Sequence, residues 1–139
     1  MAGETHGQAP VVTLGTIEPG GLAPAILAIV ERGVRLRPEL ARTIAAEVEL
    51  LVDPAYPPVR VCFAAEAVVV EDAPASAPDL RVRGELGDLI ALLVAPAIGG
   101  VPLPFTPRGR AAIGMVASRR IRVRGRPRLL RRLLAVIRI

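Results

Sequence analysis

The sequence has few aromatic residues, one cysteine, one histidine and no lysine. Its 139 residues include two Phe, one Tyr and no Trp. A disulfide framework is impossible with Cys62 alone, and a thiol-based or zinc site would need further Cys or His residues that are not there. The only histidine, His6, lies in a polar N-terminal segment. The sequence therefore predicts no metal site.

A recognisable catalytic constellation is also missing. Acid–base or nucleophilic catalysis needs convergent groups, such as a His beside a Ser or Cys, or two carboxylates in one pocket. Ser76, Ser118, Cys62 and His6 are instead scattered over expected loops, a strand and the N-terminal segment. We therefore expect that the protein is not an enzyme and that it uses no cofactor.

No segment has the pattern of a signal peptide or of a membrane span. The first ten residues, MAGETHGQAP, have neither a basic start nor an apolar run. The longest uncharged apolar stretch, residues 89–105, contains three prolines and a Gly-Gly pair. It is also shorter than the ~20 residues that a spanning helix requires. These observations predict a cytoplasmic location.

Acidic residues are absent from the last third of the chain. All 13 acids lie at or before Asp88, together with seven arginines, so residues 1–88 carry a net charge of −6. Residues 89–139 contain 11 arginines and no acid, for a net charge of +11. This basic segment favours an anionic partner, although its arginines equally suit solvated faces that pair with acids of the first half.

The apolar content is high for a chain of this length. Hydrophobic residues make up 52% of the sequence and the mean hydropathy is +0.47. A domain of this size buries roughly two-thirds of the surface of its unfolded chain. The excess indicates a crowded interior, an apolar cavity or a partner.

The hydrophobic pattern predicts a flexible tail over residues 1–18 and a single domain over residues 19–139. A first helix is expected from Gly21 to Gly33, where the glycine is expected to end it, and a second from Pro38 to Ile44. Alternation of apolar and polar residues predicts the strands that follow. In chain order, the later elements are strands 48–52, 59–63, 67–71 and 80–83, helices 86–94 and 108–117, strand 120–124 and helix 127–137.

These elements predict an α+β fold. Consecutive strands with short connections favour a five-stranded, mostly antiparallel sheet, and the helices are expected to cover one of its faces. Alternation places on the covered face Val48, Leu50, Val61, Phe63, Val68, Val70, Leu80, Val82, Ile121 and Val123. The opposite, wet face receives Arg60, Arg81, Arg83, Arg120, Arg122 and Arg124. Glu47 and Glu49 share that face and are expected to form cross-strand ion pairs with Arg60.

Three segments resemble the sterol carrier protein type 2 (SCP2) lipid-binding family. They are VRVCFAAEAVVVEDA, PDLRVRGELGDLIALL and GRAAIGMVASRRIRVRGRPRLLRRLL. In that family a hairpin and a further strand lead into a helix, a loop and a second helix, followed by a strand and a C-terminal helix. The resemblance covers Glu47 to Ile139. The hairpin lacks the usual Asp-Gly, and no peroxisomal Ser-Lys-Leu ending follows Ile139, which fits a bacterial cytosolic protein.

The resemblance implies that the apolar sheet face and the helices enclose an elongated hydrophobic cavity. Such a cavity binds a lipid, an acyl chain or a sterol-like molecule without chemistry, as a carrier or a store. The apolar loop of residues 97–107 is expected to act as a lid. The implied cavity lining is Phe63, Val82, Ile90, Leu93, Val94, Ile98, Leu103, Phe105, Ile113, Met115, Val116, Leu130 and Leu134.

Two other functions remain open on the sequence. One is an interaction or accessory module whose interior is a solid core. The other is nucleic-acid binding through the arginine-rich sheet face and the C-terminal helix. It is disfavoured because single-strand binders usually present aromatic platforms on the sheet, whereas Phe63 falls on the apolar face and Tyr56 in a turn. Transient contact with an anionic membrane surface is also expected; no oligomeric state is predicted.

Overall fold

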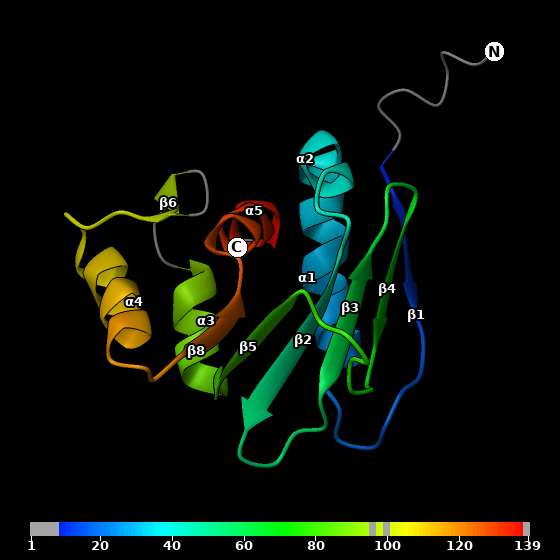
Figure 1. Ribbon diagram of the computed structural model, residues 1–139, viewed down its shortest axis with the longest axis horizontal. Coiled ribbons are helices and arrows are strands. Elements are labelled where there is room, and N and C mark those ends of the chain that lie inside the picture. The colour runs from blue at the N-terminus through cyan, green and yellow to red at the C-terminus, as the bar shows by residue number, and fades with distance from the viewer. Residues whose placement is uncertain (1–8, 95–96, 99–100, 138–139) are drawn as a thin grey trace.

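The computed structural model describes residues 9–94, 97–98 and 101–137. Strands and helices alternate irregularly along the chain (Figure 1). In order they are β1 (Val11–Leu14), α1 (Ala23–Leu36), α2 (Pro38–Arg42), β2 (Ala46–Asp53), β3 (Val59–Phe63), β4 (Ala67–Glu71), β5 (Leu80–Glu85), α3 (Leu86–Val94), β6 (Ala97–Ile98), β7 (Val101–Pro102), α4 (Pro107–Ala117), β8 (Arg122–Gly125) and α5 (Pro127–Ile137).

A six-stranded mixed sheet forms the centre of the fold. The strand order is β1-β4-β3-β2-β5-β8. Three neighbouring pairs are antiparallel, β4 with β3, β3 with β2, and β5 with β8, whereas β1 with β4 and β2 with β5 are parallel. The predicted α+β class and the predominance of antiparallel pairing are confirmed. The prediction of five strands is corrected to six, and β6 and β7 form a separate two-stranded sheet.

The additional strand, β1, lies in the segment that the sequence assigned to a flexible tail. It runs parallel to β4, with Val11 opposite Ala67 and Leu14 opposite Val70. The pairing extends past the strand, since the Gly15 amide donates to the Val70 carbonyl at 2.8 Å. The prediction of a flexible tail is therefore wrong for residues 11–15. Residues 1–8 of the expected tail lie outside the described part.

The parallel pairing of β2 with β5 depends on the connection that follows β4. This connection is anchored to the polar face of β2 by hydrogen bonds to two glutamates. The amide of Ala75 donates to Glu49 Oε2 at 2.8 Å and the amide of Ala77 donates to Glu47 Oε1 at 2.9 Å. The chain thereby passes β3 and β2 before it enters the sheet as β5, so β5 cannot form a hairpin with β4.

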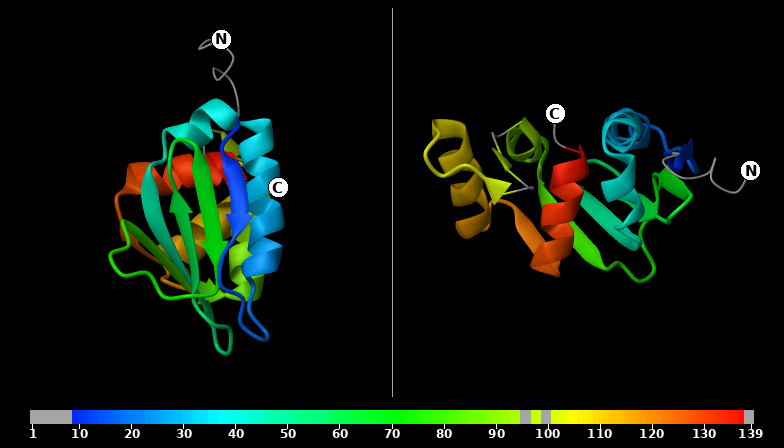
Figure 2. Two further views of the ribbon diagram at one scale, coloured as in Figure 1. Left: turned by 90° about the vertical axis from the view of Figure 1, so that its right-hand side faces the viewer. Right: turned by 90° about the horizontal axis from the view of Figure 1, so that it is seen from above.

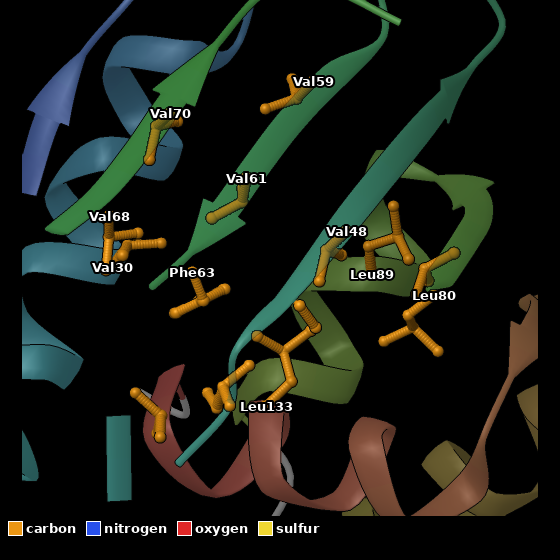
Figure 3. Packing of buried hydrophobic residues seen from close by; sticks show 14 of the residues in the cluster. Val30, Val48, Val59, Val61, Phe63, Val68, Val70, Leu80, Leu89 and Leu133 are labelled. Carbon is orange, nitrogen blue, oxygen red and sulfur yellow. The ribbon is translucent and has the colours of Figure 1, made fainter. Parts of the chain in front are cut away.

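Helices α1, α3 and α5 cover the apolar face of the sheet (Figures 1 and 2). The predicted alternation is confirmed, because eight of the ten residues assigned to this face are buried and Leu50 and Val123 are partly buried against the same core. Figure 3 shows Val48, Phe63 and Leu133, from β2, β3 and α5, among the side chains that meet in the interior. Helix α4 lies beside α3, on the side away from α1 (Figures 1 and 2).

The sequence predicted that Gly33 ends the first helix. This prediction is wrong, because α1 continues to Leu36. The role of Gly33 is contact with α5. A Cβ atom added at Gly33 would overlap the carbonyl oxygen of Val136. Nη1 of Arg37 donates a hydrogen bond to the same oxygen at 3.3 Å. The glycine therefore allows the backbones of α1 and α5 to approach closely above the sheet.

Candidate functional site

An apolar cavity of about 300 Å³ lies between the sheet and helices α1, α3 and α5. Every one of its 20 lining residues is apolar. The helices and the segment before α1 contribute Leu22, Ala25, Ile26, Ile29, Val30, Leu86, Leu89, Ile90, Leu92, Leu93, Leu130, Leu133, Leu134 and Ile137; the strands contribute Val48, Leu50, Val52, Val61, Phe63 and Val82. Nothing in this lining offers a hydrogen-bonding side chain to a ligand.

Aliphatic side chains form most of the strand side of this space. Five of the six strand residues at the cavity are Val or Leu, and Phe63 is its single aromatic ring. Native interiors contain few voids larger than a water molecule. An engineered apolar cavity of about 150 Å³ stays dry and binds small apolar molecules. A larger cavity with an entirely apolar lining is therefore suited to an apolar ligand.

The cavity reaches the surface between α1 and α3. Ala25 on α1 and Ile90 on α3 both line it and are both exposed, with 46% of Ile90 accessible to solvent. The other wall residues are partly or fully buried. A ligand that enters here passes between two helices and needs no opening of the sheet.

The position of α1 over the cavity depends on a buried aspartate after β4. Asp72 is only 3% exposed, and its two carboxylate oxygens accept hydrogen bonds from the amides of Glu18 and Ala23, both at 3.0 Å. The N-cap residue Leu22 offers no side-chain acceptor. Asp72 therefore satisfies an amide at the start of α1 and places a negative charge at the positive end of the helix dipole.

The opposite face of the sheet is held by ion pairs. Arg60 bridges Glu47 at 2.6 Å and Glu71 at 2.7 Å, which confirms the predicted pairing of Glu47 with Arg60. Glu49 pairs with Arg81 at 2.6 Å and not with Arg60, which lies opposite it in the strand register. Arg60, on β3, lies directly opposite Glu71 of β4 and reaches diagonally to Glu47 of β2.

These ion pairs lower the pKa values of three carboxyl groups. Hydrogen bonds from Arg60 lower the pKa of Glu47 and of Glu71, and the amides of Ala77 and Thr16 lower them further. Hydrogen bonds from Arg83 lower the pKa of Asp53 in the same way. In all three cases the guanidinium contact is the largest cause.

The lowered pKa values predict a loss of stability in acid. A carboxyl group with a lowered pKa in the folded state stabilises the fold at pH values above its unfolded pKa, and this contribution is lost as the pH falls through the folded value. We expect urea midpoints to be flat from neutral pH down to about pH 5 and to fall below about pH 4. Glu47→Gln should flatten the acid limb, and an unchanged limb in this variant would contradict the assignment.

Neither a scan of protein-family models nor a search of curated proteins finds a match for this chain. A search of solved structures finds a protein described as "UbiJ-SCP2 Ubiquinone synthesis protein", with a TM-score of 0.58 over 84% of both chains and 14% sequence identity. The chain has an SCP2-like fold. The resemblance is thereby confirmed at the level of the fold. The cavity between the sheet and the helices is the candidate functional site.

Six of the predicted lining residues of this SCP2-like fold lie around the cavity. They come from β3, β5, α3 and α5, namely Phe63, Val82, Ile90, Leu93, Leu130 and Leu134. The structure brings them together from segments far apart in the chain. Their contact with a ligand stays a prediction.

Six of the other predicted residues do not line the cavity. Val94, Phe105, Ile113 and Val116 are exposed, Leu103 is half-buried, and Met115 is buried in the core. The side chain of Ile98 lies outside the described part. The physical reason is the position of α4, which packs its buried residues at the side of α3 and not over the sheet.

Sequence reasoning missed the contribution of α1 and β2 to the SCP2-like cavity. Five residues in or just before α1 line it, and so do Val48, Leu50 and Val52 of β2. The helical spacing of Ile26, Ile29 and Val30 was the available signal. It predicts a buried helix face correctly, but periodicity alone does not distinguish a face that packs on a sheet from one that borders a void.

Two further properties concern the described ranges only. None of the helices there is long and apolar enough to cross a bilayer. No group of three or more His, Cys, Asp or Glu residues in those ranges is arranged to hold a metal ion.

Proposed function

We propose that this protein binds an apolar molecule non-covalently in the cavity and acts as a carrier or store, without catalysis. The ligand class is a lipid, an acyl chain or a sterol-like molecule. The single observation that carries the proposal is the cavity of about 300 Å³ with its wholly apolar lining. The SCP2-like fold supports it. A cytoplasmic location is part of the proposal and rests on the sequence.

Burial of the ligand supplies the affinity. Each methylene group removed from water contributes about 0.8 kcal/mol. Aliphatic walls without hydrogen-bonding groups discriminate little between chains of the same length. The proposal is therefore for a class of ligand defined by length and shape.

Saturable uptake of a fluorescent fatty acid tests the proposal. We expect one-to-one binding to the delipidated protein, with displacement by a non-fluorescent acyl chain. An absence of saturable uptake would favour the alternative of an interaction or accessory module with a solid interior.

Delivery to and from a membrane needs a contact surface, and the segment at the start of α4 offers one. Phe105 is the most exposed large apolar residue in the described part of the chain, at 74%. Two exposed arginines, Arg108 and Arg110, follow it on the first turns of α4. An aromatic ring that enters the interface beside cationic side chains suits an anionic bilayer. Transient contact with such a surface is part of the proposed function.

Phe105→Ser should weaken binding to vesicles that contain an anionic phospholipid. We expect at least a threefold loss in vesicle sedimentation at low salt, because the interface loses its apolar anchor. Thermal stability should be unchanged, since the side chain is exposed. Tyr56→Ser, which removes an exposed aromatic residue from the β2–β3 turn, is the control. Equal vesicle binding by wild type and Phe105→Ser would contradict this contact.

A further inference from the structure

A hollow of about 690 Å³ lies at the β8 edge of the sheet, where arginines of the outer face meet apolar residues of α4 and of the segment around β8. Strand β5 provides two arginines, β8 provides two, and the turn before β8 provides a fifth. We call this hollow the arginine groove. Its lining is Leu51, Arg81, Arg83, Val116, Arg119, Ile121, Arg122, Val123 and Arg124.

The strand register places arginines of the groove directly opposite one another. Arg81 lies opposite Arg124, and Arg83 lies opposite Arg122. Residues opposite each other on one face of an antiparallel pair have Cβ atoms about 5 Å apart, and like charges there are destabilising. Two such pairs lie side by side. An anion between the two strands would relieve the repulsion in both.

Acidic partners reach these arginines from one side only. Glu49 pairs with Arg81 at 2.6 Å and Asp53 pairs with Arg83 at 3.0 Å, both from β2. Strand β8 is the last strand of the sheet, so no strand lies beyond it to supply acids. Within the described ranges, the other three arginines of the groove form no ion pair. Arg119, Arg122 and Arg124 thus have no salt-bridge partner in the described part, and acids lie near Arg119 and Arg122 only in the adjoining hollow.

Arg119 occupies a backbone position that favours glycine. Its φ angle is +64°, in the left-handed region, immediately after the C-cap residue Ser118 of α4. Glycine is the usual residue there because it lacks a Cβ atom. The amide of Arg119 donates to the Val116 carbonyl at 3.2 Å, a bond that glycine would also make. The backbone therefore gives no reason for an arginine, whereas the groove does.

We propose that the arginine groove binds a di- or oligophosphate group. Guanidinium groups bind phosphate oxygens bidentately, and several of them in one hollow match an anion with several closely spaced charges. The adjoining hollow shares Arg83, Arg119 and Arg122 with the groove and also contains Asp53, Glu85 and Asp88, which repel an anion. We therefore expect the phosphate group nearest Arg81 and Arg124, which line the groove alone.

The groove is independent of the apolar cavity. Side chains of β5 alternate between the two sites, with Arg81 and Arg83 in the groove and Val82 in the cavity. No described residue lines both sites. A phosphate in the groove is thus a second ligand, and its binding does not depend on an apolar molecule in the cavity.

Calorimetric titration of the full chain with inorganic pyrophosphate tests the proposal. We expect saturable one-to-one binding that weakens with salt and a higher melting temperature in the presence of pyrophosphate. Inorganic phosphate should bind at least tenfold more weakly, because it carries fewer charges. The proposal would be overturned if neither this titration nor the vesicle experiment below showed saturable binding.

Two double variants of equal charge separate a site from general attraction. Arg122→Gln with Arg124→Gln should weaken pyrophosphate binding at least tenfold. Arg128→Gln with Arg131→Gln, two exposed positions on α5, should change it less than twofold. Equal losses in both would overturn the proposal. Arg119→Gly should weaken binding without lowering the melting temperature, a combination that a purely structural role of Arg119 would not produce.

The same variants distinguish a free phosphate compound from a lipid headgroup. In the second arm, the probes are phosphatidylcholine vesicles with and without phosphatidylinositol bisphosphate, a lipid whose headgroup carries two phosphates beyond the diester. Competition between pyrophosphate and this lipid at the wild-type groove supports a headgroup as well as a free compound. If the Arg122→Gln, Arg124→Gln variant loses pyrophosphate binding but keeps vesicle binding, the ligand is a free phosphate compound. If the wild type binds single-stranded DNA but neither pyrophosphate nor the vesicles, and the same variant loses DNA binding, the proposal is overturned in favour of a nucleic-acid surface.

Discussion

Val61→Phe should abolish most ligand uptake while leaving the ligand-free fold intact. Val61 lies on β3, is buried and lines the cavity. The larger side chain can extend into the void, so we expect a change of less than about 1 kcal/mol in the unfolding free energy of the delipidated protein. The ring then occupies space that the ligand needs. Loss of two or three methylene contacts removes about 2 kcal/mol, so binding of a fluorescent fatty acid should weaken at least tenfold.

Val59→Phe is the matched control for this experiment. Val59 lies two residues earlier on the same strand, faces the same side and is fully buried, but it does not line the cavity. The added volume meets packed side chains there and should cost about 1–3 kcal/mol in a urea melt. Fatty-acid binding by the folded fraction should be close to that of wild type. Equal destabilisation by both substitutions, with unchanged uptake, would show that the interior is solid at Val61.

Asp72→Ala should destabilise the fold more than any substitution of an exposed acid. It removes the acceptor for the amides of Glu18 and Ala23. Because the site is buried, water replaces the carboxylate poorly, and we expect a loss of about 2–4 kcal/mol in the unfolding free energy. The start of α1 should also loosen at the mouth of the cavity, which hydrogen exchange of the α1 amides would show as reduced protection.

Asp88→Ala is the comparison for Asp72→Ala. Asp88 pairs with Arg120 at 2.7 Å; the Asp88 side chain is 14% exposed and that of Arg120 is 63% exposed. A pair with one exposed partner contributes about 1 kcal/mol, and the charge in the first turn of α3 adds a few tenths. Similar losses in the two variants would contradict the assignment of Asp72 as the buried cap of α1.

Local patterns predicted the elements well because each depends on neighbouring residues. The alternation from Val59 to Phe63 and from Ala67 to Glu71 gave two strands with the structure's own boundaries. Their hairpin forms although Ala65-Glu66 is a poor turn pair, since the amide of Ala64 donates to the carbonyl of Ala67 at 2.9 Å. Cross-strand packing of the valines therefore outweighs turn propensity at this position.

Features that depend on distant contacts were not predicted. Strand β1 has four residues, and its partner β4 lies more than 50 residues away. Gly33 has the local pattern of a helix end, yet contact with the backbone of α5 explains it, and that contact joins residues about 100 positions apart. Neither pairing leaves a trace in the residues beside it.

The lining residues assigned on the covered face of the sheet lie at the cavity. The residues assigned on or near α4 do not line it, because their position depends on how α4 packs. Phe63 and Val82 follow from alternation alone, and the structure places both at the cavity. Phe105 belongs to the loop expected to act as an apolar lid, and Ile113, on the helix that follows, was part of the cavity lining that the resemblance implies. Both residues are exposed. An apolar residue in a loop or on a helix can therefore face the cavity or the solvent, and only the packing of its element decides which.

The dependence of affinity on ligand length tests the central claim most directly. Dissociation constants are measured by calorimetry for delipidated wild type with saturated fatty acids from octanoic to hexadecanoic acid, each below its critical micelle concentration. An apolar cavity of limited volume predicts that each added methylene lowers the dissociation constant about fourfold until the chain fills the cavity, after which the constant levels off. A constant that does not depend on chain length, or binding that never saturates, would contradict the cavity as the ligand site.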